Sequence, residues 1–353
     1  MKVKLGELTK IRTGKLDANA ASENGKYPFF TCSKEPLRIS TYSYDCECVL
    51  VAGNGDLNVK YYNGKFDAYQ RTYIVESNGD GRLHLPYLYH FMTRYIQELR
   101  KLSIGGVIKY IKLGNITDAE ISLPSIKEQK DACEKLKKVK NIIDKKEAQI
   151  SYLDNLIKAR FVEMFGDRFL NTMNWPTKKL GDCATFRNGK AHEKVISETG
   201  QYVLITSRAI ASDLQDVRHT DSLLTPLATG DIVMVMSDVP NGKALAKCLL
   251  ITENEKYTLN QRICSLSNYD LNPVFFTYLL NRHQFFLSFN DGNGQTNLRK
   301  DDILNCPLIR PSIELQNQFA NFVAQIDKSK FAVQKSLEKT QLLFDSLMQE
   351  YFG

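Results

Sequence analysis

Residues 124–166 read PSIKEQKDACEKLKKVKNIIDKKEAQISYLDNLIKARFVEMFG, and this stretch decides the fold because a second copy of it occupies residues 311–353. The residues that reappear at an offset of 187 positions, without an insertion, are Pro124, Ser125, Ile126, Gln129, Glu163, Phe165 and Gly166. An internal repeat of this kind indicates two copies of one structural unit.

Both copies predict one long helix of about 40 residues, or roughly 60 Å. Neither copy has a proline or glycine in its interior, and each begins with Pro-Ser and ends at glycine, which is the usual punctuation of a helix. Ser125 followed by Glu128 predicts a capping box at the first helix, whereas the second helix keeps only the Ser312 cap.

Apolar residues recur at heptad spacing along both helices and predict that the two helices pair as a coiled coil. Polar residues interrupt the rows at Lys146 and Arg160 in the first copy and at Lys330 and Thr340 in the second, so the interruptions fall at different levels. A plain core or a homodimer zipper is the alternative. The predicted helix-pairing residues are Leu136, Val139, Ile143, Ile150, Leu153, Ile157, Phe319, Val323, Ile326, Val333, Leu337 and Phe344.

Composition places the chain among ordinary globular proteins. Its 353 residues suggest two domains, 43% of them are apolar, and no apolar run has the length of a membrane span. Eight cysteines without a Cys-x-x-Cys pair, and no signal peptide, predict a cytoplasmic protein. The net charge of +7 is compatible with nucleic-acid binding but does not require it.

The regions before the two helices predict small β-rich α+β domains, because short apolar runs alternate with Gly, Asn and Asp turns. The first has one predicted helix from Pro86 to about Leu102. Leu5, Gly6, Arg12, Gly14 and Lys15 recur as Leu180, Gly181, Arg187, Gly189 and Lys190. The predicted fold is therefore α+β with a pseudo-twofold repeat: domain 1–123, helix 124–166, domain 167–310 and helix 311–353.

The sequence predicts no catalytic residue, cofactor or metal site. The segment Asn272–Phe275 approaches the catalytic motif of adenine methyltransferases but lacks its second proline, so Pro273 is expected to begin a helix. Gly53-Asn54-Gly55 lacks the third glycine of a dinucleotide-binding loop, and the chain has no Gly-Lys-Ser/Thr loop. The five histidines are scattered without the spacing of metal ligands.

The order domain, long helix, domain, long helix, with the helix start Leu123-Pro124-Ser125-Ile126-x-x-Gln129, resembles the specificity subunit of type I restriction-modification systems. The second helix start has Arg310 in place of the apolar residue. A strand-plus-glycine signature appears at Val49–Gly55 and again at Gly230–Val235, with Asn241 and Gly242 further on.

This resemblance implies two target recognition domains, each of which reads one half of a bipartite double-stranded DNA target. It also implies that the paired helices run antiparallel as a coiled coil and act as a spacer. Two methyltransferase (M) subunits, and restriction (R) subunits, would supply the chemistry, and no membrane would be involved.

Base readout requires Arg, Lys, Asn or Gln side chains at the major groove and cations on phosphates. Residues 60–65 and 208–218 differ between the domains and are predicted base readers, whereas the matched pairs Gln70-Arg71 and Gln261-Arg262 are predicted to brace loops. The candidates, expected in or beside turns, are Arg12, Lys15, Asn54, Lys60, Tyr61, Tyr62, Lys65, Gln70, Arg71, Arg187, Lys190, His192, Lys194, Arg208, Arg218, Lys243, Gln261, Arg262, Arg299 and Lys300.

Two other classes of function stay open from the sequence. The chain is alternatively a coiled-coil structural protein with protein-binding heads, or the recognition fragment of a restriction-methylation enzyme. Salt-dependent binding of a bipartite DNA separates the first alternative from DNA recognition. A methylation assay on the isolated chain separates the second.

Overall fold

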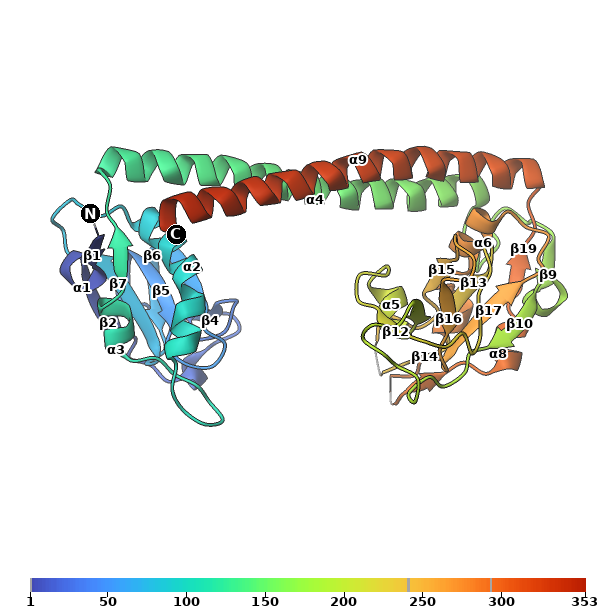
Figure 1. The fold of residues 1–353 in the computed structure, drawn as a ribbon, viewed down its shortest axis with the longest axis horizontal. Helices are drawn as coiled ribbons and strands as arrows, with labels where there is room; N and C mark the ends of the chain where they lie inside the picture. The colour runs from blue at the N-terminus through green and yellow to red at the C-terminus, as the bar shows by residue number, and fades with distance from the viewer. Residues whose placement is uncertain (1, 240–241, 293) are drawn as a thin grey trace. The chain divides into compact units, whose positions relative to one another are not determined.

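The computed structural model describes residues 2–239, 242–292 and 294–353, and the chain forms two compact units. The first unit comprises residues 1–148 and 334–353, and the second comprises residues 149–333. Each unit therefore holds one sheet-rich domain together with part of each long helix (Figure 1). Within the described residues, no helix combines the length and hydropathy that a membrane crossing needs.

The domain of the first unit is a six-stranded sheet in the order β2-β7-β5-β6-β3-β4. Its neighbours pair antiparallel except β3 and β6, which run parallel. The central strand β5 ends in an apolar run that is buried along its length, as expected of a strand covered on both faces. The strands are β2 (Thr9–Thr13), β3 (Tyr27–Phe30), β4 (Leu37–Ile39), β5 (Tyr44–Ala52), β6 (Val59–Ala68) and β7 (Thr72–Ser77).

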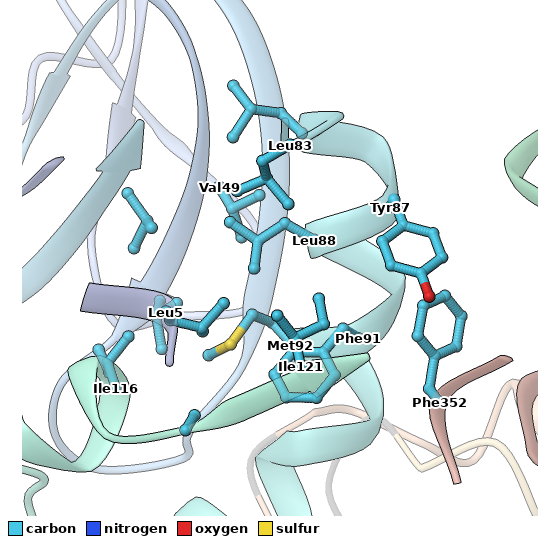
Figure 2. Close-up of a cluster of buried hydrophobic side chains, with 14 of the residues drawn as sticks. Leu5, Val49, Leu83, Tyr87, Leu88, Phe91, Met92, Ile116, Ile121 and Phe352 are labelled. Carbon is cyan, nitrogen blue, oxygen red and sulfur yellow. The ribbon is translucent and has the colours of Figure 1, made fainter. Parts of the chain in front are cut away.

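Helix α2 (Leu85–Leu102) covers this sheet and confirms the helix predicted from Pro86. The short helices α1 (Leu5–Leu8) and α3 (Leu113–Thr117) and the paired strands β1 (Lys2–Lys4) and β8 (Glu120–Ser122) close the same core. Figure 2 shows Leu88 and Met92 of α2 among the buried side chains of these elements.

The C-terminal end of α9 belongs to this core. The ring of Phe352 lies 4.8 Å from that of Tyr87, and both side chains are buried (Figure 2). The Tyr87 hydroxyl also donates to the backbone oxygens of Ser122 at 3.2 Å and Tyr351 at 3.3 Å. The last turn of α9 is thus fixed to the first domain by apolar and polar contacts together.

The domain of the second unit has a four-stranded sheet, β10-β17-β13-β15, and a three-stranded sheet, β12-β11-β16, with the two-stranded pairs β14-β18 and β19-β9. Its strands are β9 (Thr177–Lys179), β10 (Thr185–Asn188), β11 (Tyr202–Ile205), β12 (Arg218–Thr220), β13 (Ile232–Val235), β14 (Ser237–Asp238), β15 (Cys248–Leu250), β16 (Tyr257–Leu259), β17 (Ile263–Ser267), β18 (Thr296–Asn297) and β19 (Pro307–Ile309). Its helices are α5 (Ser207–Ala211), α6 (Pro273–Leu280), α7 (Gln284–Leu287) and α8 (Lys300–Leu304).

The structure confirms that Pro273 begins a helix. It is the first residue of α6, and Asn272 caps that helix by accepting hydrogen bonds from the backbone N–H groups of Val274 and Phe275 at 3.0 and 3.2 Å. The segment that approaches a methyltransferase motif therefore has a structural role in this fold. All eight cysteines are free.

The long helices are α4 (Ile126–Phe165) and α9 (Ile313–Phe352), each of 40 residues, which confirms the predicted lengths. The predicted capping box is present, since Ser125 N–H donates to the Glu128 carboxylate at 2.8 Å and Glu128 N–H donates to Ser125 Oγ at 3.4 Å. At α9 the cap bond runs from Leu315 N–H to Ser312 Oγ at 3.4 Å.

The two helices contact each other in both units. In the first unit, Leu136 of α4 shares a core with Met348 and Phe352 of α9. In the second unit, Ile157 shares a core with Phe319. Of the predicted helix-pairing residues, those buried are Leu136, Val139, Ile143, Ile157, Phe319 and Val323, and those partly buried are Ile150, Leu153, Ile326, Val333, Leu337 and Phe344.

Three of the four polar interruptions of the apolar rows have partners on the opposite helix, and the fourth, Thr340, donates its hydroxyl to the Ser336 oxygen of its own helix at 2.7 Å. In the first unit, Lys146 Nζ donates to Ser336 Oγ. In the second unit, Lys330 Nζ lies 2.5 Å from Asp154 Oδ1, and the Arg160 guanidinium lies over the Phe322 ring at 5.7 Å. Each of these three cationic side chains therefore contacts the opposite helix at the level where its apolar row is interrupted.

Two matched glutamines, one on each long helix, join the helices to their domains. Gln129 Oε1 accepts from His84 N–H at 2.9 Å, and Gln129 Nε2 donates to the Arg82 and Pro124 oxygens at 2.8 and 3.0 Å. Gln316 Oε1 likewise accepts from the backbone N–H of Asn272 at 2.9 Å. The glutamine of the Pro-Ser-Ile-x-x-Gln pattern is therefore the clamp between the long helix and the first turn of α2 or α6.

We expect Gln129→Ala to lower the free energy of unfolding of the first unit by about 1–3 kcal/mol, because the buried partners of the amide would lose their hydrogen bonds. Urea unfolding measures the change. Asn141→Ala, which removes an exposed amide of the same helix within the first unit, is the matched control and should stay within about 0.5 kcal/mol. Equal effects of the two substitutions would show that the clamp contributes nothing.

Arg310, the departure from the apolar residue at the start of the second helix, has an aspartate partner. Its guanidinium donates two hydrogen bonds to the Asp270 carboxylate, at 2.8 and 2.6 Å. These bonds hold the pKa of Asp270 below its usual value and raise that of Arg310. The matched positions of the first repeat are Leu83 and Leu123, which pack in the apolar core, so an ion pair replaces two leucines.

We expect Arg310→Leu alone to destabilise the second unit by about 1 kcal/mol, the scale of a partly exposed ion pair, and Asp270→Leu combined with Arg310→Leu to restore stability. Because the folded pKa of Asp270 is depressed, its contribution is present above the ordinary aspartate pKa of about 4 and is lost as the pH falls through the folded value. Urea unfolding at pH 7 and pH 3 tests this. A double variant with the same acid sensitivity as the native chain would contradict it.

Candidate DNA interface

Four segments of the first domain converge on a fifth, the turn 69–71 between β6 and β7. We call them the first loop cluster; they are residues 13–16, 31–34, 53–58, 69–71 and 103–111. The loop 103–111 leaves the end of α2 and projects from the domain (Figure 1).

Gln70 and Arg71 lie at the centre of this cluster, where their backbone groups form hydrogen bonds to the neighbouring loops. Gln70 N–H donates to the Leu16 oxygen at 2.9 Å, and Gly53 N–H donates to the Arg71 oxygen at 2.8 Å. Ile111 N–H then donates to the Gly53 oxygen at 2.9 Å. The backbone of this matched pair therefore holds two loops directly and a third through Gly53, which agrees with the predicted bracing role, while both side chains are exposed.

The second domain repeats the same hydrogen bonds. Gln261 N–H donates to the Lys190 oxygen at 2.9 Å, Met236 N–H to the Arg262 oxygen at 2.9 Å, and Leu298 N–H to the Met236 oxygen at 2.8 Å. Asn260 N–H also donates to the Ile205 oxygen at 3.1 Å. We call this set of segments the second loop cluster; it comprises residues 189–192, 205–208, 236–238, 260–262 and 295–298. Each domain thus presents a group of loops held by one common backbone frame.

Matched glycines allow the loops to approach each other. A Cβ atom at Gly14 would overlap the backbone oxygen of Ala68, and one at Gly189 would overlap that of Asn260. Only glycine fits where two backbones pass so closely. The repeated Gly-Lys pairs of the sequence are therefore explained by the glycine, and the lysines that follow, Lys15 and Lys190, are exposed.

A family described as "Type I restriction modification DNA specificity domain" matches residues 1–152 and 173–342 of this chain. The chain belongs to this family. The specificity subunit of the type I restriction enzyme EcoDI from Escherichia coli is 40% identical over 156 residues, which is 44% of this chain and 34% of the length of that subunit. The match to this curated relative thus spans about a third of the relative's length.

Solved structures share the fold. The S subunit of a type I restriction-modification system from M. genitalium superposes with a TM-score of 0.61 at 16% identity, covering 100% of this chain and 96% of that one. A chain from a structure that describes complex assembly and conformational transition of a type I system has a TM-score of 0.59 at 15% identity, covering 100% and 97%.

The predicted readers Lys60, Tyr61, Tyr62 and Lys65 do not lie in a turn, which corrects the sequence prediction. They belong to β6, which pairs with β5 from Tyr44 opposite Phe66 to Val51 opposite Val59. Lys60 Nζ donates to the Ser33 oxygen at 2.7 Å, and burial lowers its pKa. Cross-strand pairing takes precedence here over the local turn signal of the polar residues.

Tyr61 and Tyr62 lie on different sides of β6. Tyr61 lines a groove of about 1030 Å³ beside α2 and α4 and donates to Glu47 Oε1 at 2.8 Å. Burial, and then the Glu47 carboxylate, raises the pKa of Tyr61 to about 12, so the phenol stays protonated at neutral pH. The Tyr62 ring packs against Phe30 and Phe66, and Lys65 Nζ lies 4.7 Å from the centre of the Tyr42 ring.

Three predicted contacts have hydrogen-bond or ion-pair partners within their own domain. Arg12 lies in β2 and pairs with Glu76 at 2.9 Å. Arg187 lies in β10, where it donates to the Pro226 oxygen at 2.7 Å and lies 3.5 Å from the Asp231 carboxylate. His192 is only 1% exposed, so the structure removes it from the candidate DNA contacts. Its ring nitrogens are bonded within the domain, to the Lys190 oxygen at 2.7 Å and to the Thr258 hydroxyl at 3.0 Å.

The remaining candidates of the second domain are spread over its loop cluster, the adjoining helices and other parts of the domain. Arg208 lies in the first turn of α5, within the cluster, and Arg218 is in β12, paired with Leu204 of β11. Arg299 caps α8 directly after the cluster, and Lys300 lies over the Phe186 ring at 6.0 Å. Lys194 and Lys243 are exposed on loops. Asn241 of the glycine signature lies outside the described residues.

The structure adds residues that sequence reasoning missed. The loop 103–111 reaches the first cluster, where Asn54 forms a bridge to Tyr110. Gln295 and Asn297 reach the second cluster, where Asn297 pairs with Ser237. The signal that could have found both loops was their glycines, at 105 and 106 in the first and at 292 and 294 in the second.

The described residues contain no group of three or more His, Cys, Asp or Glu side chains placed to hold a metal ion. The lysines and arginines of the clusters instead suit phosphates, and the exposed amides and guanidinium groups suit base edges. The arrangement is chemically equipped to bind a polyanion and to read hydrogen-bonding groups.

Proposed function

We propose that this chain is a DNA-recognition subunit of a type I restriction-modification system and has no catalytic activity of its own. Each loop cluster would read one half of a bipartite double-stranded target. Methyltransferase subunits, two by the family resemblance, and restriction subunits would supply methyl transfer and cleavage.

One observation carries this proposal: the two loop clusters share a backbone frame but display different exposed side chains. The backbone hydrogen bonds around Arg71 have equivalents around Arg262. The segments on that frame differ, with Gly105–Tyr110 in one domain and Gly292–Asn297 in the other. A shared scaffold with different loops is what two readers of different half-sites require, and family membership supports the same conclusion.

We further infer that α4 and α9 pair as an antiparallel coiled coil and set the spacing between the half-sites. The contacts of Leu136 with the Phe352 region in one unit, and of Ile157 with Phe319 in the other, support this pairing. Large apolar side chains that stay exposed on the helices, such as Tyr152 at 67% and Leu342 at 69%, are available for partner subunits.

The test is binding of the purified chain, with and without its methyltransferase partner, to a random duplex library followed by sequencing. We expect the partner complex to enrich a bipartite sequence, with an affinity that falls steeply as the salt concentration rises. Methyl transfer should require the partner. Enrichment of a single uninterrupted site, or methyl transfer by the chain alone, would overturn the proposal.

A further inference from the structure

The loop 103–111 carries two strongly exposed apolar side chains at its tip. Val107 is 104% exposed and Ile108 is 63% exposed, and Ile104 adds a third apolar side chain at 43%. Single exposed apolar residues are ordinary on protein surfaces. Adjacent ones at the tip of a projecting loop suggest a surface that is covered when a partner binds.

Backbone hydrogen bonds hold this tip in place. Ile104 and Tyr110 exchange two of them, at 3.0 and 2.8 Å, so residues 105–109 form a short closed turn. Gly55 N–H donates to the Lys109 oxygen at 2.9 Å, which ties the turn to the loop that carries Asn54. Little conformational freedom would therefore be lost when the tip meets a ligand.

One position of the turn, residue 105, accepts only glycine. Gly105 has a φ of +116°, and a Cβ there would lie 2.6 Å from the Ile108 oxygen. This close approach directs the chain back at the tip, and Val107 and Ile108 remain in the solvent.

Positive charge surrounds the tip and points to nucleic acid as its partner. Lys109 and Lys112 lie in or beside the turn, and the exposed Arg71 belongs to the same loop cluster. The nearby Asp56 carboxylate is neutralised, since Arg100 lies 3.3 Å and Lys34 lies 3.9 Å from it. An apolar tip among cations fits a duplex groove, where phosphates flank the bases.

The matched loop of the second domain carries different chemistry on the same frame. At the offset of 187 residues, Val107 and Ile108 correspond to Gly294 and Gln295. Gln295 Nε2 donates to Ser237 Oγ at 2.6 Å. Amide side chains suit the hydrogen-bonding edge of adenine, whereas apolar side chains suit the C5 methyl group of thymine.

We propose that Val107 and Ile108 contact thymine methyl groups in the half-site read by the first domain. This inference rests on the proposed function, and it states which chemical group of the DNA the first loop cluster recognises. Contact with a methyl group that already projects into the major groove needs no distortion of the duplex. A wedge between base pairs would have to unstack them, at a cost of a few kcal/mol.

The experiment uses the full chain in complex with its methyltransferase partner and duplexes that carry the enriched bipartite sequence. Uracil replaces thymine in one half-site at a time, which removes only the C5 methyl group. Fluorescence anisotropy measures the dissociation constants. We expect uracil in the first half-site to weaken binding about 4-fold for each contacted methyl group.

The Val107→Ala/Ile108→Ala variant should bind thymine DNA more weakly and should lose its sensitivity to uracil in the first half-site. Gln295→Ala is the matched control, and its response to uracil there should equal that of the native chain. Thermal unfolding of the complexes verifies that the variants are folded. The uracil series on the native chain tests the inference independently of any variant.

Four results would overturn this inference. They are a first half-site without thymine, a native complex indifferent to uracil, a loop variant that keeps the full response to uracil, and a loop variant that no longer binds the methyltransferase in the absence of DNA. Absence of any enriched bipartite sequence would instead refute the proposed function, so the two failures are distinguishable.

Discussion

Replacing Phe319 by alanine is expected to lower the free energy of unfolding of the second unit by about 3–5 kcal/mol. Phe319 is completely buried and comes from α9. Its ring centre lies 5.4 Å from that of Phe161 and 5.7 Å from that of Phe165, both on α4, and 5.4 Å from that of Tyr278 on α6. The substitution would leave a cavity where both long helices meet the domain.

Trp175, the single tryptophan, reports on this unit because its Nε1 donates to the Phe165 oxygen at 3.0 Å. Urea unfolding followed by its fluorescence measures the effect. Tyr152→Ala removes a ring that is 67% exposed on α4 in the same unit, and it should change stability by no more than about 0.5 kcal/mol. A Phe319→Ala protein as stable as this control would refute the packing described.

A paired insertion of four residues, after Gln149 in α4 and after Ser336 in α9, is expected to lengthen the spacer of the DNA target by one to two base pairs. Four residues add about 6 Å to each helix, equivalent to about two base pairs of rise. Because four residues form a stutter in a heptad pattern, local unwinding would absorb part of the change. Both half-sites should persist.

An insertion in α4 alone is the control, because it puts the apolar rows of the two helices out of register. Each displaced large side chain would lose burial that contributes about 1.5–3 kcal/mol. We expect this variant to lose methylation activity with its partner. Sequencing of methylated sites measures both variants, and an active paired variant with an unchanged spacer would show that the helices do not set the spacing.

The long helices could be predicted from the sequence to within two residues at each end. Forty residues without proline or glycine, with Ser125 and Glu128 at one start, leave little choice of structure. The partners of Lys146 and Lys330 could not be predicted, because Ser336 and Asp154 lie far away in the sequence. Those pairs follow from the packing of one helix on the other.

The strand β6 shows how tertiary pairing overrides a local signal. Polar residues and the Asn63-Gly64 pair favour a turn, and Gly64 has a φ of +134°. The chain nevertheless continues as a strand, because Val49 to Val51 of the buried β5 require a partner along that edge. Lys60 therefore contacts the loop at Ser33 instead of standing free in a turn.

The loop clusters could be predicted only in part. The repeated Gln-Arg pairs indicated a common frame, and the frame bonds of Arg71 and Arg262 agree with that interpretation. The loop 103–111 was missed because Gly105 and Gly106 mark only that a loop is present, whereas its attachment to the cluster is a backbone bridge between Asn54 and Tyr110. Backbone contacts between distant segments are determined by the fold as a whole.

The central claim is that the two domains share one backbone arrangement and that each loop cluster reads its own half-site. The most direct test is to exchange one loop cluster and map the methylated sites. Segments 53–58 and 103–111 would be replaced together by those of a family member with another target, and the methylated genome of cells that also express the methyltransferase partner would be sequenced. We expect one half of the recognised sequence to change while the other half and the spacer stay the same. A simultaneous change of both halves would contradict it.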